Sequence, residues 1–186
     1  MRETLFFRFN GKKIEWVALG QDGQRLEEGL SGVDLFNSRF SGTYDGFIVF
    51  VVSGEKVLMT NASVPSKQKR KIAQAVPFVV EEQLAAEIDD SVFAIGERNQ
   101  KGEVQVSVID EEVLEGIMVL LQELDLRPNK MISETSLVKS KDSAVAVIED
   151  DRAHFMRPDG CGITLQKDNV AAAISVVEPS SGLELI

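Results

Sequence analysis

The sequence predicts a mixed α+β protein that is rich in β-strands, and three observations support this class. Up to Gly29, apolar and polar residues alternate between the turn-forming pairs Asn10-Gly11 and Asp22-Gly23, as in an antiparallel meander. Residues 47–52 (FIVFVV) form an unbroken apolar run, which is typical of a strand covered on both faces. From Val57 to Leu126 the pattern predicts a strand, a helix, two strands and a second helix.

The N-terminal part is expected to hold the three strands of the meander, a short helix and the buried strand. Turn-forming residues at 41–46 separate the helix from the buried strand. The expected ranges are Leu5–Phe9, Ile14–Leu19, Gln24–Gly29, Val33–Phe40 for the helix, and Phe47–Val52.

The segment Lys67–Glu87 is predicted to be an amphipathic helix that follows a strand at Val57–Ala62. Pro65 turns the chain ahead of it and Ser66 is the expected N-cap. Pro77 removes a backbone donor in the middle, so a kink is expected, and the Pro77-Phe78 pair is expected to belong to the interior. Its buried face is expected to contain Ile72, Ala75, Val76, Val79, Val80 and Leu84.

The charges of this helix oppose its macrodipole. Basic residues (Lys67, Lys69, Arg70, Lys71) precede acidic ones (Glu81, Glu82, Glu87), although the dipole favours the reverse order by about 0.3–1 kcal/mol per exposed charge. Two interpretations remain open: a solvated face that tolerates its charges, or an acidic end that faces a basic partner.

The remainder of the chain predicts one more helix and several short strands. A helix after Asp110 should bury one stripe, and residues 143–186 should begin a new antiparallel sheet near Ser143. The expected strands are Val92–Glu97, Val104–Ile109, Lys130–Leu137, Ala144–Ile148, Ala153–Met156 and Gly162–Leu165. The stripe is Val113, Leu114, Ile117, Met118, Leu121 and Leu124, and a final short helix is expected at Asp168–Ile174.

Composition places the chain among ordinary soluble proteins, with 186 residues of which 44% are hydrophobic and 27% charged. A formal net charge of −10 argues against a nucleic-acid surface, which needs clustered Lys and Arg. The single cysteine, Cys161, forms no internal disulfide and suits a reducing cytoplasm. No run approaches the roughly 18 apolar residues of a membrane span, and the N-terminus is too charged for a signal peptide.

Nothing in the sequence predicts an enzyme. His154 is the only histidine and lies in a predicted strand without partners nearby in sequence. Cys161 lies in a Gly-Cys-Gly turn with no second thiol or imidazole close in sequence. The paired carboxylates are adjacent residues, which point in different directions, and no phosphate-binding glycine motif is present. We therefore expect no catalytic residue, no metal site and no cofactor.

The central block resembles a known family. The runs VLMTNASVP (57–65) and AVPFVVEEQLAAEIDDSVFAIG (75–96) are similar to the signature of the cytoplasmic region of the type II secretion system L protein. The matching positions are Pro77-Phe78, residues 81–85 (EEQLA) and residues 93–96 (FAIG). Val92 stands where the family usually has histidine.

This resemblance implies the cytoplasmic domain of a bitopic bacterial inner-membrane protein, with a degenerate actin-like ATPase (RNase H-like) fold. It implies recruitment of the secretion ATPase through that ATPase's N-terminal domain. A membrane span, and a periplasmic domain that pairs with the M protein, would follow Ile186. The first lobe would comprise residues 1–53 and 130–142, with residues 54–129 as an inserted α+β module, and residues 143–186 would begin a truncated second lobe.

The hairpins that hold phosphates in actin-like ATPases are incomplete here. Residues 9–13 contain a glycine but no aspartate, and residues 148–153 contain aspartates but no glycine. A scaffold is therefore predicted, with partner-binding residues Glu81, Glu82, Glu87, Asp89 and Asp90. The alternatives are an actin-like nucleotide-binding protein of a pilus-type assembly machine, and a homodimer formed through a strand edge at Val57–Ala62 or near Ala144.

Overall fold

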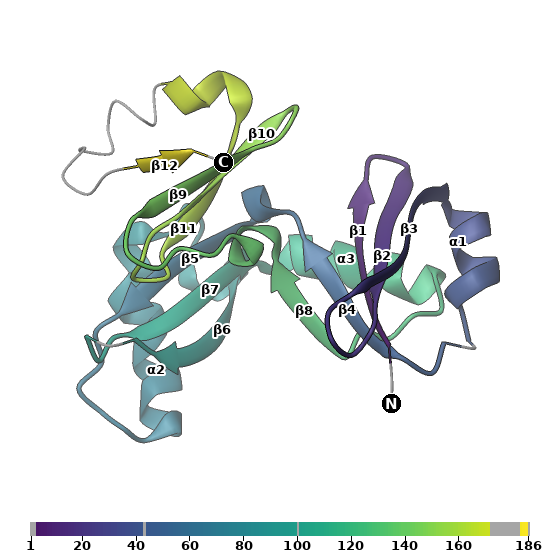
Figure 1. The fold of residues 1–186 in the computed structure, drawn as a ribbon. Coiled ribbons are helices and arrows are strands. Elements are labelled where there is room, and N and C mark those ends of the chain that lie inside the picture. Colours follow the sequence, from purple (N-terminus) through teal and green to yellow (C-terminus); the bar gives the residue numbers. More distant parts are fainter. Residues whose placement is uncertain (1–2, 43, 100, 172–182, 186) are drawn as a thin grey trace. The chain divides into compact units, whose positions relative to one another are not determined.

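The computed structural model describes residues 3–42, 44–99, 101–171 and 183–185. The chain divides into two compact units (Figure 1). The first unit comprises Met1–Ser53 with Val113–Ser133, and the second comprises Gly54–Glu112 with Glu134–Ile186.

The first unit contains a five-stranded sheet in the order β3-β2-β1-β4-β8. β1 (Thr4–Asn10), β2 (Lys13–Leu19) and β3 (Arg25–Gly32) are antiparallel, which confirms the predicted meander. β4 (Phe47–Val52) and β8 (Lys130–Ser133) run parallel to β1 and to each other. Every residue of β4 after Phe47 is buried, as its apolar run predicted. The strand expected to reach Leu137 ends at Ser133, where a 3₁₀ turn, η4 (Glu134–Leu137), begins.

Aromatic rings form much of the first unit's core. Helix α1 (Val33–Phe40) buries Phe36 and Phe40. The Phe36 ring centroid lies 5.3 Å from that of Phe7, and the Phe40 centroid lies 4.9 Å from that of Trp16. Phe7 and Trp16 are paired across β1 and β2, so both side chains project from the same sheet face onto α1.

The second long helix of the chain, α3 (Glu111–Glu123), buries less of its predicted stripe than the periodicity suggested. Leu121 and Leu124 are buried, each 2% exposed, but Met118 is 53% exposed. The assignment of Met118 to the core was therefore wrong.

The second unit contains a seven-stranded sheet in the order β12-β9-β10-β11-β5-β7-β6. β11 and β5 are joined by the single pair Gly162 and Met59, so the predicted new sheet is continuous with the preceding strands. β9 pairs with β10 on one side and β12 on the other, whereas β5 pairs along its length with β7 and at one residue pair with β11. A homodimer through a strand edge stays a prediction. The strands are β5 (Val57–Ala62), β6 (Ser91–Arg98), β7 (Val104–Asp110), β9 (Ala144–Ile148), β10 (Arg152–Met156), β11 (Gly162–Gln166) and β12 (Leu183–Leu185).

The final helix expected at 168–174 is described only in part. Residues 167–169 form the 3₁₀ turn η5 (Lys167–Asn169), and residues 172–174 lie outside the described part of the chain.

Helix α2 (Lys69–Val80) packs against one end of this sheet. Its residues Ile72, Val76 and Val80 are 8%, 0% and 0% exposed and join the core of the β5–β7–β6 end. Val79, predicted to be buried, is 43% exposed. The helix runs through Pro77, and the rest of that core is formed by Ala62, Val64, Val104, Val106 and Val108.

Both ends of α2 differ from the prediction. Gln68, without a side-chain cap, is the N-cap instead of Ser66, whose hydroxyl accepts the Gln68 N–H at 3.1 Å. The helix ends at Val80 instead of Glu87, and a 3₁₀ turn, η2 (Glu81–Gln83), follows. The acidic residues therefore lie beyond the α-helix.

Candidate functional site

We define the docking segment as residues 78–90, which comprise the end of α2 and its connection to β6 through η2 and a second 3₁₀ turn, η3 (Ile88–Asp90). All five predicted partner-binding residues lie in it and are exposed, namely Glu81, Glu82, Glu87, Asp89 and Asp90. Within the described part of the chain, none of their carboxylates forms a hydrogen bond or an ion pair. The fold therefore leaves these charges available to solvent or to a partner.

Apolar packing and two hydrogen bonds hold the docking segment in place. Val80 is buried, and Leu84 packs against the same apolar core. The Thr60 hydroxyl on β5 donates to Oε1 of Gln83 at 2.6 Å, and the Ser91 hydroxyl donates to the Glu87 carbonyl at 3.0 Å. These contacts hold the backbone at four positions, residues 80, 83, 84 and 87, so the acidic groups lie on a defined surface.

Two apolar side chains at the start of the segment are also exposed. Phe78 is 71% exposed and Val79 is 43% exposed. The expectation that Phe78 belongs to the interior was wrong, because Phe78 lies off the helix face formed by Ile72, Val76 and Val80. Exposed apolar groups rimmed by polar residues are typical of protein-binding surfaces.

β6 continues this exposed region. It is the last strand of its sheet in the described part of the chain, and its residues from Ala94 to Arg98 are exposed. Ile95 is 38% exposed. A terminal strand carries backbone donors and acceptors that can pair with a partner's strand.

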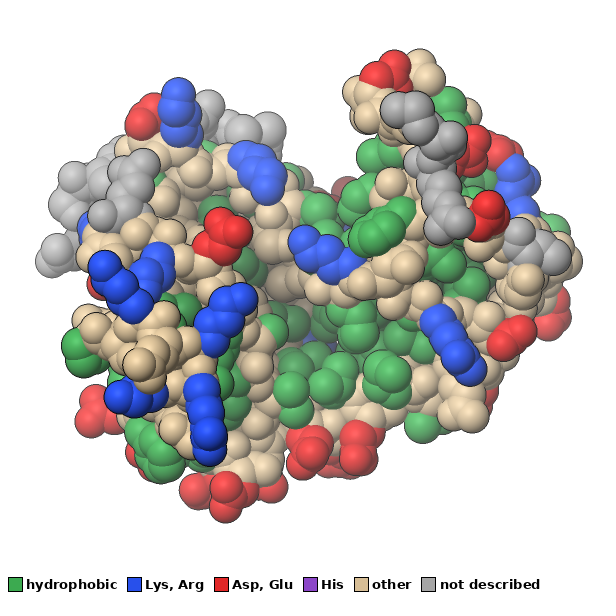
Figure 2. All heavy atoms as spheres, turned by 90° about the horizontal axis from the view of Figure 1, so that it is seen from below, with side chains coloured by type: hydrophobic (Ala, Val, Ile, Leu, Met, Phe, Trp, Pro, Cys, Tyr) green, Lys and Arg blue, Asp and Glu red, His purple; other side chains and the backbone are tan. Residues whose placement is uncertain are grey.

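The basic residues at the other end of α2 are exposed as well. Lys67, Lys69, Arg70 and Lys71 all face solvent, and the first turn contains no acidic residue. In Figure 2, several Lys and Arg side chains lie on the surface in the left half of the view, and Asp and Glu side chains lie along its lower edge as well as higher up. The charge order that opposes the dipole is therefore a surface property of the folded chain.

Cys161 is half-buried in the turn between β10 and β11. Its Sγ accepts a hydrogen bond of 3.2 Å from Nδ2 of Asn61 on β5. Burial, together with the nearby Asp159 carboxylate, raises the pKa of the Cys161 thiol to about 11. The group is therefore protonated at neutral pH, which does not suit a nucleophile.

The two hairpins considered for phosphate binding differ in structure. Gly11 has φ +59° in the exposed β1–β2 turn. In the β9–β10 turn, the Arg152 guanidinium donates to both oxygens of Asp151 at 3.0 Å. Asp151 is therefore already neutralised within its own hairpin.

Comparison with known proteins decides the family. A sequence model described as type II secretion system (T2SS), protein L, matches residues 8–183. This chain belongs to the type II secretion system protein L family. A curated relative, the type II secretion system protein L of Pectobacterium carotovorum subsp. carotovorum, is 24% identical over 152 residues, which are 80% of this chain and 35% of the relative. The chain thus spans about a third of that relative's length.

Solved structures confirm the predicted fold. The cytoplasmic domain of EpsL, an inner-membrane component of the type II secretion system of Vibrio cholerae, matches 98% of this chain and 81% of its own, with a TM-score of 0.78 and 12% identity. A Bacteroides thetaiotaomicron protein with an actin-like ATPase fold matches 94% of this chain and 76% of its own, with a TM-score of 0.53 and 10% identity. Among the described residues, no helix is long and apolar enough to cross a membrane.

Proposed function

We propose that this chain is a docking scaffold without catalytic activity, which recruits the secretion ATPase by binding its N-terminal domain through the docking segment. One observation supports this proposal above the others. Five exposed acidic residues, whose carboxylates have no partner among the described residues, follow an exposed phenylalanine on a segment that the core anchors.

The two kinds of exposed group would act differently in an interface. Phe78 offers a large aromatic side chain, of the type enriched at interface centres. The carboxylates would form a charged rim that attracts a basic partner and accelerates association. Because those carboxylates have no partner within the described part of the chain, binding would not require breaking an existing ion pair.

The cellular setting is part of the same proposal. The Vibrio relative is described as the cytoplasmic domain of an inner-membrane component. By extension, this chain is the cytoplasmic domain of a bitopic inner-membrane protein, and the M protein is contacted through regions that this chain does not contain. The inserted module at residues 54–129 is proposed as the part that meets the ATPase.

A matched pair of charge reversals tests the docking proposal. Glu82→Lys/Glu87→Lys should weaken binding of the ATPase N-terminal domain at least about tenfold, measured by isothermal titration calorimetry at two salt concentrations. Glu115→Lys/Glu123→Lys on exposed positions of α3 changes the net charge equally and should leave the affinity within about twofold. Equal losses in both variants would indicate an effect of net charge alone, and unchanged binding in the first would place the interface elsewhere.

Nucleotide binding is the second candidate, favoured by the similarity to a protein with an actin-like ATPase fold. Calorimetry with ATP and magnesium separates the two functions. Saturable binding would favour the nucleotide-binding alternative, and its absence together with ATPase recruitment would favour the scaffold.

A further inference from the structure

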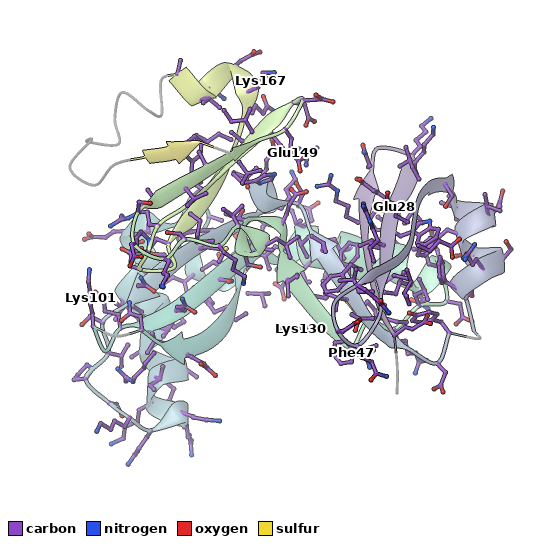
Figure 3. The ribbon with its side chains drawn as sticks, viewed as in Figure 1. Glu28, Phe47, Lys101, Lys130, Glu149 and Lys167 are labelled. Carbon is purple, nitrogen blue, oxygen red and sulfur yellow. The ribbon has the colours of Figure 1, made fainter. Side chains whose placement is uncertain are left out.

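Three side chains that are far apart in the sequence converge in the second unit. Glu134 lies in η4, Glu149 follows β9, and His154 lies in β10. One donor atom from each lies within 4.8 Å of the other two. His154 and Glu134 are 2% and 3% exposed, whereas the Glu149 side chain, labelled in Figure 3, is 36% exposed. The group is therefore buried on two sides and reachable from solvent past Glu149.

The surroundings of His154 fix its orientation. Its Nδ1 lies 2.7 Å from the Thr164 hydroxyl oxygen, which in turn lies 2.7 Å from the Thr135 hydroxyl oxygen. With the Nδ1–H donating to Thr164, the lone pair of a neutral ring lies on Nε2. A hydrogen bond from one ring nitrogen to a buried oxygen is the usual way in which a metal-binding histidine is positioned.

The Nε2 of His154 is buried and has no hydrogen-bond partner within the described part of the chain. It points at the Glu149 carboxylate, with Oε1 at 3.8 Å. That distance is too long for a hydrogen bond but is near the separation of two ligand atoms on one ion, about 3.3–3.6 Å for metal–ligand bonds of about 2.0–2.2 Å in a tetrahedron. A cation between the two groups would give the buried nitrogen a partner, with the Glu149 carboxylate as a further ligand.

Glu134 supplies the third donor from the buried side. Its Oε2 accepts the Gly54 N–H at 3.2 Å and lies 3.3 Å from Nη1 of Arg152. These contacts hold the carboxylate in the interior beside His154. Arg152 is then a competitor, because its guanidinium and a metal ion both seek the same negative charge.

We propose that Glu134, Glu149 and the Nε2 of His154 form a binding site for a divalent transition-metal ion of the zinc class. One imidazole and two carboxylates are a donor set that suits zinc and its neighbours better than calcium or magnesium, which take all-oxygen sites. Thr164 is a positioning residue that sets the ring through Nδ1. The ion would tie the β9–β10 hairpin to η4.

Zinc titration of the tag-free chain after chelator treatment tests the site directly. His154 is the chain's only histidine, so loss of binding in His154→Gln is easily assigned. We expect binding of one zinc ion by calorimetry and a rise in melting temperature with zinc. Glu149→Gln, a partly exposed position that should fold normally, should weaken binding at least about tenfold.

Two controls keep the result specific. Asp150→Asn removes an exposed carboxylate from the same turn and should leave affinity unchanged. Cys161→Ser removes the only thiol and should also leave it unchanged. Cobalt substitution provides a spectroscopic signature, because nitrogen and oxygen ligands give visible d–d bands without thiolate charge transfer.

The proposal is overturned if zinc does not saturate, or if Glu149→Gln binds zinc as the parent chain does. It is also overturned if Asp150→Asn loses affinity equally, because that result would indicate non-specific attraction to acidic groups. These outcomes are independent of ATPase binding, which is measured through a different surface.

Discussion

The two ends of the second unit's sheet place acidic side chains in opposite environments, exposed in the docking segment at one end and buried at Glu134 at the other. At the β5–β7–β6 end, the carboxylates of the docking segment are exposed and have no intramolecular partner in the described part of the chain. At the β9–β10–β11 end, Glu134, His154, Thr135 and Thr164 are buried and lie in hydrogen-bond contact or close to one another. Exposed charge is available for recognition of a protein, whereas buried charge must be paired and can hold an ion.

The largest effect is expected where α2 meets the core. Val76→Asp places a carboxylate in a fully buried apolar site and should lower the free energy of unfolding by about 3–5 kcal/mol. Val79→Asp, three residues later and 43% exposed, should change it by less than about 0.5 kcal/mol. Urea unfolding followed by far-ultraviolet circular dichroism compares them, and similar losses would mean that the two faces of α2 are equally buried.

Val76 and Val79 also show how much of this region could be predicted from the sequence. Helical periodicity identified α2 and its buried residues Ile72, Val76 and Val80. It placed Val79 and Met118 in the core as well, because periodicity alone does not say how wide the covered stripe is. The width of a helix's buried stripe depends on which elements pack against the helix, and those elements are distant in sequence.

The buried polar cluster could not be predicted for a related reason. His154 has no candidate partner near it in sequence, and the absence of any metal site was expected on that ground. Glu134 and Thr164 reach it only because β10 pairs with β11 and η4 lies beside both. The strands themselves were predicted, but their joining to β5 through the pair Gly162 and Met59 left no local signal.

Cys161 lies where the two ends of the sheet join, because its turn leads into β11 and its Sγ contacts Asn61 on β5. The reactivity of its thiol tests whether this turn is buried. Because burial raises its pKa from 9.0 to about 11, the thiolate fraction at pH 8 should be about a hundredfold lower than for an ordinary cysteine. Alkylation by iodoacetamide, followed by mass spectrometry, should accelerate until the pH approaches 11. A plateau near pH 9, as for a free thiol, would contradict the burial of this turn.

Replacement of Gly54 tests how closely the hydroxyl groups of Thr135 and Thr164 pack at the β9–β10–β11 end of the sheet. A methyl group there would overlap the hydroxyl oxygens of Thr164 and Thr135, so Gly54→Ala should lower the free energy of unfolding by about 1–3 kcal/mol. Gly116→Ala on α3 is the matched control, since the added carbon would meet nothing within 4 Å apart from its chain neighbours and its own helix backbone, and it should stabilise by about 0.5–1 kcal/mol. Thermal unfolding of both variants distinguishes them, and a neutral Gly54→Ala would show that the hydroxyl groups are not closely packed.

The smallest effect on stability is expected for the docking segment's charges. Glu82→Gln/Glu87→Gln/Asp89→Asn removes three exposed carboxylates that have no partner within the described chain, so the free energy of unfolding should change by less than about 0.5 kcal/mol. Any change should be a slight gain, because neighbouring like charges repel, and it should disappear in high salt. Urea unfolding at low and high ionic strength measures both the change in the free energy of unfolding and its dependence on salt. A loss above about 1 kcal/mol would mean that these carboxylates support the fold, and the contrast with the buried end of the sheet would then fail.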